Sequence, residues 1–573
     1  MRDPGNPIIV QSDRSVLLEV DNPRYEEARD SLAQFAELVK SPEHIHTYRI
    51  TPLSLWNAAA AGMGAEEMVA VLVRFGKYDL PENVRHEILE SVRRYGLLKL
   101  QQHGDALALT STDPFLLDEA LSHDAARALL GERLDAHAVR VAPAHRGHLK
   151  QTLIKLGYPV EDLAGYVAGD PLAVCLRERT PGGQAFALRA YQRQAVDAFY
   201  AGGSARGGSG VVVLPCGAGK TLVGLGAMEK VGAHTLIIAT NTVAVRQWID
   251  EILNRTALAP EEVGEYTGDA KEIRPVTITT YQALTYRRRK EEEFLHLGLF
   301  TCRNWGLIIY DEVHLLPAPV FRVTADIQAR RRLGLTATLV REDGREDDVF
   351  SLIGPKKYDV PWRDLERQGW IAQAICCELR LPLPDDLRRA YATAPLREKY
   401  RVAAENPDKI ALAGKLVERH RDDPVLIIGQ YLDHLEAIAA HFRAPLITGK
   451  TPNREREALY DGFRDGSVKL LIVSKVANFS IDLPDASVAI QVSGTFGSRQ
   501  EEAQRLGRIL RPKADGRPAL FYSLVTRNTR DQEFAANRQL FLTEQGYRYL
   551  IYDGLPPETE TAGCPAAPPH PTR

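Results

Sequence analysis

The residues best suited to chemistry begin with a glycine-rich loop around Lys220. Residues 215–221 read Pro-Cys-Gly-Ala-Gly-Lys-Thr, after an apolar run and before a stretch of helical composition. Such glycines let backbone N–H groups surround phosphate oxygens at a helix N-terminus, while the lysine reaches the β and γ phosphates and the hydroxyl binds Mg2+. Leu214 stands where the full pattern has glycine, and a chance match is the minority alternative. The predicted nucleotide-binding residues of the loop are Gly217, Ala218, Gly219, Lys220 and Thr221.

The second motif is acidic and follows another apolar run. Asp311, Glu312 and, two positions later, His314 come directly after residues 307–310, which read Leu-Ile-Ile-Tyr. A carboxylate at the tip of a buried strand suits Mg2+, and a neighbouring glutamate can orient or deprotonate the attacking water. We therefore predict Mg2+ ligation by Thr221 and Asp311, catalysis by Glu312 and a place for His314 beside ATP. A satisfied surface histidine is the alternative for His314.

Two arginines share one predicted helix face far along the chain. Gln504, Arg508 and Arg511 fall at positions i, i+4 and i+7, with Gly507 inside the same segment. Arginines that reach a γ phosphate from another domain stabilise the charge of phosphoryl transfer. A solvated basic face is the commoner alternative, but a glycine inside a helix costs about 1 kcal/mol and needs a reason. We predict that Arg508 and Arg511 are catalytic and that Gln504 contacts ATP.

Polar residues at the ends of other apolar runs suit a DNA groove or its coupling to the nucleotide. Hydroxyls and amides at strand ends fit phosphate contacts, although the same residues also serve as ordinary caps. The predicted residues of this kind are Asn241, Thr280, Thr336 and Thr338.

Apolar runs alternate with helical segments on both sides of residue 360. The first series comprises residues 210–215, 235–240, 275–280, 306–311 and 332–338, and the second comprises 425–429, 445–449, 469–474, 488–493 and 519–525. This alternation predicts two parallel sheets covered by helices, an α/β fold with two tandem RecA-like lobes. Before them, residues 51–110 read as three helices and two short strands, which indicates a winged-helix-like module.

The totals limit the class of protein. A chain of 573 residues with 44% hydrophobic and 26% charged residues predicts several soluble domains, and no apolar run approaches a membrane span. Six scattered cysteines give no zinc or disulfide pattern. The N-terminus lacks the apolar core of a secretory signal, which predicts a cytoplasmic protein. The net charge of -3 means that nucleic-acid contact must come from local grooves.

With these motifs in place, the sequence resembles the XPB family of superfamily 2 DNA helicases, in its bacterial form. The most specific match is Arg341, Glu342 and Asp343 just after the Thr-Ala-Thr tract, because the family has an Arg-Glu-Asp motif there that supports unwinding. Arg189 and Gln192 match the glutamine motif on the adenine side, and residues 497–503 match the segment before the arginine helix.

The resemblance covers most of the chain and implies its domain boundaries. The expected domains are an N-terminal accessory domain (1–110), a small α+β domain like the family's damage-recognition domain (111–183), lobe 1 (184–360), lobe 2 (361–555) with a thumb-like insertion near 380–405, and a disordered tail (556–573). The chain departs from the family at residues 477–479, Ala-Asn-Phe, where Gly-Asp-Thr is frequent. Asp482 keeps the later acid of that coupling motif.

The resemblance implies an ATP- and Mg2+-dependent 3'-to-5' DNA helicase that acts in DNA repair. Its expected partners are single-stranded, forked or damaged duplex DNA and a repair nuclease, and no membrane. A duplex-DNA translocase that remodels protein–DNA complexes without strand separation is the close alternative. RNA unwinding and a non-enzymatic nucleotide-dependent scaffold are further alternatives.

Overall fold

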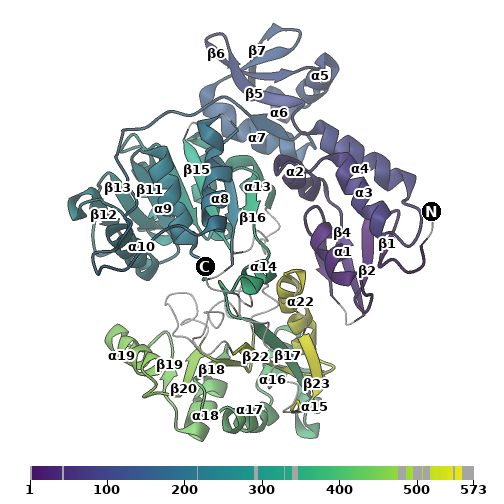
Figure 1. Ribbon diagram of the computed structural model, residues 1–573, viewed down its shortest axis with the longest axis vertical. Coiled ribbons are helices and arrows are strands. Elements are labelled where there is room, and N and C mark those ends of the chain that lie inside the picture. Colours follow the sequence, from purple (N-terminus) through teal and green to yellow (C-terminus); the bar gives the residue numbers. More distant parts are fainter. Residues whose placement is uncertain are drawn as a thin grey trace. The chain divides into compact units, whose positions relative to one another are not determined.

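The computed structural model describes residues 3–41, 44–204, 206–215, 217–289, 294–327, 330–337, 346–474, 486–494, 502, 506, 517–545, 547 and 549–557. The chain forms two compact units, of which the first comprises most of the chain up to Val360 and the second comprises Pro361–Arg573 with two short earlier segments. Each unit contains one seven-stranded sheet with helices beside it, and the first unit also contains the five-stranded sheet and most of the four-stranded sheet (Figure 1). No helix in these ranges is long and apolar enough to cross a membrane.

The chain begins with a small sheet that the sequence did not predict. Its strands are short and pair in the order β1-β2-β4-β3. Three helices follow, and α2 starts with a capping box in which Thr51 accepts from the Ser54 backbone and Pro52 occupies the first turn. We call residues 8–94 the N-terminal module. Its elements are β1 (Ile8–Val10), β2 (Ser15–Glu19), α1 (Tyr25–Leu32), β3 (Glu37–Lys40), β4 (Ile45–Arg49), α2 (Pro52–Ala60), α3 (Ala65–Phe75) and α4 (Glu82–Arg94).

The two strands after α4 do not form the wing of a winged helix, which corrects that prediction. They pair with each other and join a five-stranded sheet of order β7-β8-β6-β5-β9. Their apolar residues pack into the core of this small domain, residues 98–162. Its elements are β5 (Leu98–His103), β6 (Ala106–Ser111), α5 (Pro114–Ser122), α6 (Asp124–Arg127), β7 (Leu130–Asp135), β8 (Ala138–Val141), α7 (Arg146–Lys155) and β9 (Val160–Asp162).

Lobe 1 has a seven-stranded sheet in which neighbouring strands run parallel. The order is β12-β13-β11-β14-β15-β10-β16, and the predicted apolar runs supply β10, β11, β13, β14 and β15. The strands are β10 (Ser209–Val213), β11 (Thr235–Ala239), β12 (Val263–Tyr266), β13 (Val276–Thr280), β14 (Leu307–Asp311), β15 (Arg331–Thr336) and β16 (Lys356–Asp359). The helices are α8 (Ala190–Tyr200), α9 (Lys220–Val231), α10 (Thr242–Arg255), α11 (Tyr281–Leu284), α12 (Ala318–Asp326) and α13 (Glu346–Leu352).

Lobe 2 repeats the same architecture, so the predicted fold of two RecA-like lobes is confirmed. Its seven parallel strands follow the order β19-β20-β18-β21-β22-β17-β23. The strands are β17 (Ala374–Leu381), β18 (Val425–Gly429), β19 (Leu446–Ile447), β20 (Leu470–Ser474), β21 (Val488–Gln491), β22 (Ala519–Thr526) and β23 (Tyr549–Asp553). The helices are α14 (Trp362–Arg367), α15 (Asp385–Thr393), α16 (Leu396–Ala404), α17 (Asp408–Arg419), α18 (Leu432–Phe442), α19 (Asn453–Arg464) and α22 (Arg530–Glu544).

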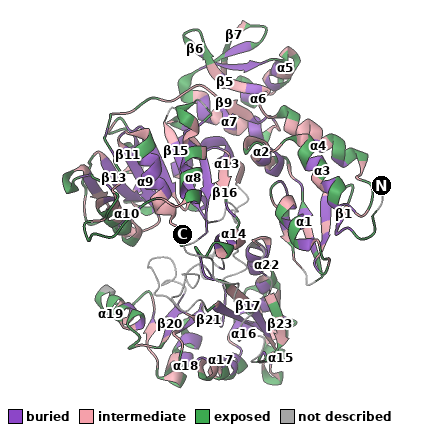
Figure 2. Ribbon diagram, in the orientation of Figure 1, coloured by how far each residue is buried: buried purple, intermediate pink, exposed green. Residues whose placement is uncertain are grey.

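Burial explains why these sheets form from continuous apolar runs. The inner strands β11 and β18 are buried along their whole length, and Figure 2 shows many further buried residues in the strands of both sheets. A parallel sheet with helices on both faces has no solvated side, so its strands do not alternate apolar with polar residues. The two resulting cores lie within lobe 1 and within lobe 2.

Lobe 2 contains a buried histidine whose lowered pKa favours the neutral form. His434 on α18 is buried, and among the described residues neither of its ring nitrogens has a hydrogen-bond partner. Burial, with a smaller contribution from the Lys409 ammonium, lowers the pKa of His434 from 6.5 to about 4. The folded state therefore binds this proton more weakly than the unfolded state, so stability is lost as the pH falls from 6.5 towards 4.

We expect His434→Leu to remove about 3 kcal/mol of the acid-induced loss of stability by pH 4, because a leucine has no proton to bind. The measurement is the difference in unfolding temperature between variant and parent at pH 7.5 and at pH 4.5. That difference should grow in favour of the variant at the lower pH. The exposed His441→Leu, on the same helix, is the control. An equal difference at both pH values would contradict the assignment.

Candidate nucleotide-binding site

The glycine-rich loop lies between β10 and α9, as the sequence predicts. Gly217 and Gly219 adopt positive φ angles of 79° and 78°, and α9 begins at Lys220 directly after them. This backbone region strains residues that have a Cβ. A Cβ on Gly219 would also lie 2.6 Å from the Gln192 amide nitrogen, so a larger residue would require that side chain to shift.

The acidic motif lies at the same edge of the sheet as the loop. In the strand order β14 and β10 flank β15, and the strands run parallel, so their carboxyl ends lie side by side. This edge is where open α/β sheets bind ligands. Lys220 Nζ lies 3.1 Å from Glu312 Oε1, which brings together two residues far apart in the sequence. Glu312 adopts a left-handed φ of 48°, an uncommon conformation that often marks functional positions.

His314 and Thr336 form a polar chain with Glu312. His314 Nδ1 lies 2.8 Å from the Thr336 hydroxyl and 3.5 Å from Glu312 Oε2. The His314 side chain is almost fully buried, so the surface alternative considered for it is wrong. Thr336 is the last residue of β15, and this chain of contacts joins the acidic motif to the start of the Thr-Ala-Thr tract.

Asp311 is fixed by two aromatic side chains whose role the sequence did not reveal. Trp248 Nε1 donates to Asp311 Oδ2 at 3.0 Å, and the Tyr281 hydroxyl donates to the Asp311 carbonyl at 3.0 Å. Both aromatic residues are buried. The only signal for Trp248 is its place on the buried stripe of α10 with Val245 and Ile252.

The pKa values of the two adjacent carboxyl groups are shifted in opposite directions. Burial, reinforced by the neighbouring Glu312, raises the pKa of Asp311 to about 6. Burial would also raise the pKa of Glu312, but the Lys220 ammonium and His314 outweigh it and hold that pKa below its ordinary value. The two carboxylates lie close together, share one cation and repel each other. A divalent ion bound between their oxygens would relieve that repulsion.

Curated proteins from several kingdoms match this chain over nearly its whole length. It is 58% identical over 550 residues to "DNA 3'-5' helicase XPB" of Kineococcus radiotolerans, covering 96% of each chain. It is 57% identical over 548 residues to the protein of the same name from Mycobacterium tuberculosis, covering 96% of this chain and 98% of the relative. The chain belongs to the XPB family of DNA helicases.

More distant XPB proteins and family models agree with this assignment. The "General transcription and DNA repair factor IIH helicase/translocase subunit XPB" of Encephalitozoon cuniculi is 34% identical, with 98% of this chain and 84% of that protein covered. The model "ERCC3/RAD25/XPB C-terminal helicase" matches residues 365–564, and "Type III restriction enzyme, res subunit" matches residues 185–341. The model "Helicase conserved C-terminal domain" matches residues 8–135.

The glutamine motif of this XPB-family chain lies beside the loop. Gln192 is 1% exposed, and its amide oxygen accepts from the Arg189 backbone N–H at 2.9 Å. The Arg189 guanidinium donates to the Tyr191 hydroxyl at 3.2 Å. The structure therefore brings Gln192 to the loop, whereas adenine contact by Arg189 stays a prediction.

The predicted groove residues Asn241 and Thr280 cap helices. Asn241 accepts from the Ala244 backbone N–H at 2.9 Å at the start of α10, and Thr280 accepts from the Ala283 backbone N–H at 2.9 Å at the start of α11. These are the ordinary capping interactions expected of such residues. DNA contact by either side chain stays a prediction.

Several predicted site residues lie outside the described residues, and their roles stay predictions from the sequence. They are Thr338, Arg341, Glu342, Asp343, Asp482, Gln504, Arg508 and Arg511. The predicted disordered tail, residues 556–573, also falls almost wholly outside the described part of the chain. The thumb-like insertion corresponds in position to the helices α15 and α16.

Proposed function

We propose that this chain is an ATP-dependent 3'-to-5' DNA helicase whose hydrolytic centre comprises Lys220, Asp311 and Glu312. The observation that carries the proposal is the meeting of the Lys220 ammonium with the Glu312 carboxylate, 3.1 Å apart, at the carboxyl edge of the lobe 1 sheet. The polarity and the substrate follow the names of the two bacterial relatives.

Each residue has a distinct task in this proposal. The backbone N–H groups after Gly217 and Gly219 surround the phosphates, and Lys220 leaves Glu312 to meet the β and γ phosphates. Thr221 and Asp311 would hold Mg2+, which when bound would neutralise charge on the transferring phosphoryl group. Glu312 then orients and deprotonates the attacking water, for which its low pKa keeps it ionised.

The contacts of Glu312 provide a route from hydrolysis to DNA. His314 and Thr336 contact it directly, and residues 337–343 continue from Thr336 into the Thr-Ala-Thr and Arg-Glu-Asp motifs. A change at the γ phosphate therefore reaches these motifs through neighbouring side chains. We further propose that Arg508 and Arg511 stabilise the charge of phosphoryl transfer, and that Gln504 contacts ATP.

A second candidate function is translocation along duplex DNA without strand separation. The names of eukaryotic XPB relatives contain "helicase/translocase", which favours this candidate. We propose a cytoplasmic location, forked or damaged DNA as substrate and a repair nuclease as partner for the helicase function.

The test compares ATP hydrolysis with single-stranded DNA, duplex DNA, forked DNA and RNA at equal nucleotide concentration. A helicase predicts the strongest stimulation by forked and single-stranded DNA, together with strand displacement. Stimulation by duplex DNA with triplex displacement, but no strand separation, would favour the translocase. Preferential stimulation by RNA would contradict both.

We expect Trp248→Phe to lower the ATPase rate about tenfold at limiting Mg2+, because Asp311 loses a hydrogen bond that a charged acceptor strengthens. The measurement is ATPase rate against Mg2+ concentration, and the half-saturating concentration should rise. Trp370→Phe, a change of the same chemistry at a partly exposed tryptophan of lobe 2, is the control. An unchanged Mg2+ dependence in Trp248→Phe would show that the indole does not position Asp311.

A further inference from the structure

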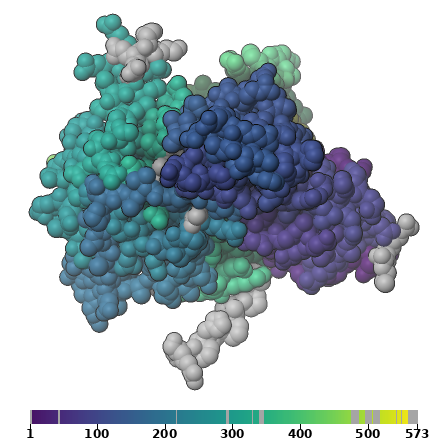
Figure 3. Space-filling model, turned by 90° about the horizontal axis from the view of Figure 1, so that it is seen from above, coloured from purple at the N-terminus to yellow at the C-terminus, as the bar shows by residue number. Residues whose placement is uncertain are grey.

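A cavity of about 470 Å³ lies in the first unit, away from the glycine-rich loop. Its walls come from the end of α2, from the small domain and from the region of lobe 1 around β16. Contacts of side chains hold these three parts together: Lys356 N donates to Asn57 Oδ1 at 3.0 Å, and Gln151 donates to Asp348 at 2.9 Å. Figure 3 shows the small domain in blue against the purple N-terminal residues and the teal residues of lobe 1.

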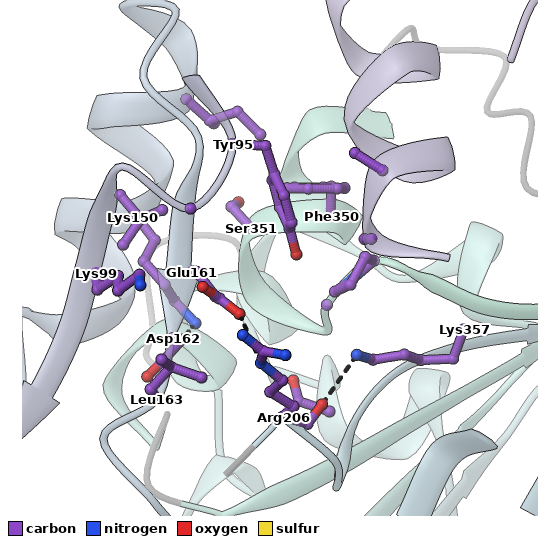
Figure 4. A pocket seen from close by; sticks show the side chains of 18 of the residues that line it. Tyr95, Lys99, Lys150, Glu161, Asp162, Leu163, Arg206, Phe350, Ser351 and Lys357 are labelled. Atoms are coloured by element: carbon purple, nitrogen blue, oxygen red, sulfur yellow. Dashed lines mark hydrogen bonds and ion pairs between the residues drawn. The ribbon is translucent and has the colours of Figure 1, made fainter. Parts of the chain in front are cut away.

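The charged residues that line the cavity are mostly basic. Four cations face two carboxylates, and Figure 4 shows Lys150 and Lys357 approaching the cavity from opposite sides. The cations are Lys99, Lys150, Arg206 and Lys357, and the carboxylates are Glu161 and Asp162.

Both carboxylates are already neutralised by close partners. Asp162 lies 2.7 Å from Arg146 and 2.8 Å from the buried Lys150, and Glu161 lies 3.2 Å from Arg206. The cluster therefore carries excess positive charge before any ligand binds. Because each carboxylate is paired, the excess falls on the remaining lysines.

The remaining two ammonium groups, on Lys99 and Lys357, form no ion pair with a carboxylate among the described residues, and Glu161 acts on Lys357 only from a greater distance. Lys357 Nζ donates to the Arg206 backbone carbonyl at 2.9 Å, and no ion pair involves Lys99 within the described ranges. Burial lowers the pKa of Lys357, which means that its charge is poorly solvated. An anion that entered the cavity would compensate that charge.

One neutral group, the Tyr95 hydroxyl, adds a hydrogen-bond donor to the cavity. The Tyr95 hydroxyl points into the cavity, and the Phe350 ring forms part of its wall (Figure 4). Ser209 also lines it, and its hydroxyl accepts from Arg332 at 2.9 Å, which adds a further buried positive charge behind the wall. The volume exceeds that of an ion and falls within the range for small-molecule sites.

We propose that this cavity binds a phosphate group, carried either by a small free ligand or by a nucleic-acid backbone. Lys99 and Lys357 contact the phosphate oxygens, and the Tyr95 hydroxyl donates to one of them. Ser209 begins β10, the strand that leads to the glycine-rich loop, so an occupant would contact the same strand as the proposed ATP site from its opposite end. The proposal does not depend on the helicase assignment.

The first test measures stabilisation of the full chain by inorganic pyrophosphate in a Lys220→Ala background, which removes the lysine of the glycine-rich loop. A ligand that binds only the folded state raises the unfolding temperature with its concentration. We expect the shift to persist in this background and to disappear when Lys99→Gln and Lys357→Gln are added. Lys356→Gln is the matched control, because Lys356 pairs with Asp359 at 2.8 Å and does not line the cavity.

The second test measures binding of a 3'-tailed oligonucleotide to the same lysine variants in the otherwise natural chain. If the phosphate belongs to a nucleic acid, the Lys99→Gln, Lys357→Gln variant should bind roughly tenfold more weakly than the Lys356→Gln variant. Loss in the pyrophosphate test alone identifies a small free phosphate ligand, and loss in the oligonucleotide test identifies a backbone phosphate.

The proposal is overturned if the Lys99→Gln, Lys357→Gln variant retains binding in both tests. It is also overturned if Lys220→Ala alone abolishes the pyrophosphate shift while the Lys99→Gln, Lys357→Gln variant still binds the oligonucleotide normally. Lys357→Arg keeps the charge and should keep binding. This variant separates loss of charge from damage to the fold, because misfolding would affect both substitutions.

Discussion

Lys220→Ala is expected to lower ATP hydrolysis by about 10³-fold, because the site loses the cation that meets the charge of the transferring phosphoryl group. In the structure this ammonium already lies 3.1 Å from Glu312, inside the site and largely shielded from solvent. In that shielded place, water would compensate poorly for the loss of the ammonium charge. DNA-stimulated phosphate release at saturating ATP is the measurement.

Lys230→Ala provides the control for this prediction. Lys230 lies in the last turn of the same helix, α9, and pairs with Asp197 at 3.5 Å on the surface. Surface pairs of this kind contribute little, so this variant should hydrolyse ATP normally. Normal turnover in Lys220→Ala would remove the loop from the chemistry altogether.

Glu312→Gln is expected to bind ATP and Mg2+ but to hydrolyse ATP about 10³-fold more slowly, because the attacking water loses its general base. The substitution also removes the negative charge that raises the pKa of Asp311. Asp311 therefore stays ionised to a lower pH, and Mg2+ affinity should be kept. The variant should accumulate in an ATP-bound state on DNA.

Equilibrium binding of a fluorescent ATP analogue and single-turnover hydrolysis separate these effects. Glu272→Gln, an exposed glutamate of lobe 1, is the control and should behave as the parent in both. If Glu312→Gln loses nucleotide binding, Glu312 is structural and the base must be sought elsewhere.

The sheets could be predicted because their strands carry local signals. The runs that became β10 and β14 are mostly apolar, and β15 is apolar after Arg331 and Arg332. These strands lead to the glycine-rich loop, to Asp311 and to Thr336. Parallel topology then places these ends at one edge, so the neighbourhood of Lys220 and Glu312 followed from the order of strands and motifs.

The prediction from sequence was wrong where the pairing of strands depends on segments that are distant along the chain. Strands β5 and β6 follow three helices, which is typical of a winged helix, yet Leu109 on β6 pairs with Val139 on β8. No local pattern reveals that partner. The strands β1 to β4 are short, between three and five residues, and carry too few apolar positions for a clear period.

The directions in which side chains point also could not be predicted from the sequence. The contact of Trp248 with Asp311 joins α10 to the end of β14, and nothing in the sequence orients the indole. The basic cavity likewise combines Lys99 and Lys150 of the small domain with Lys357 of lobe 1. Each lysine alone has the features of an ordinary surface residue, and only the fold brings them together.

Strand displacement from duplexes with a single-stranded tail is the most direct test of the central claim. A duplex with a 3' tail and one with a 5' tail are compared with ATP, with a non-hydrolysable analogue and with the Lys220→Ala variant. The account predicts displacement only from the 3'-tailed duplex, only with ATP and only by the parent chain. Displacement from the 5'-tailed duplex, or equal displacement by Lys220→Ala, would contradict it.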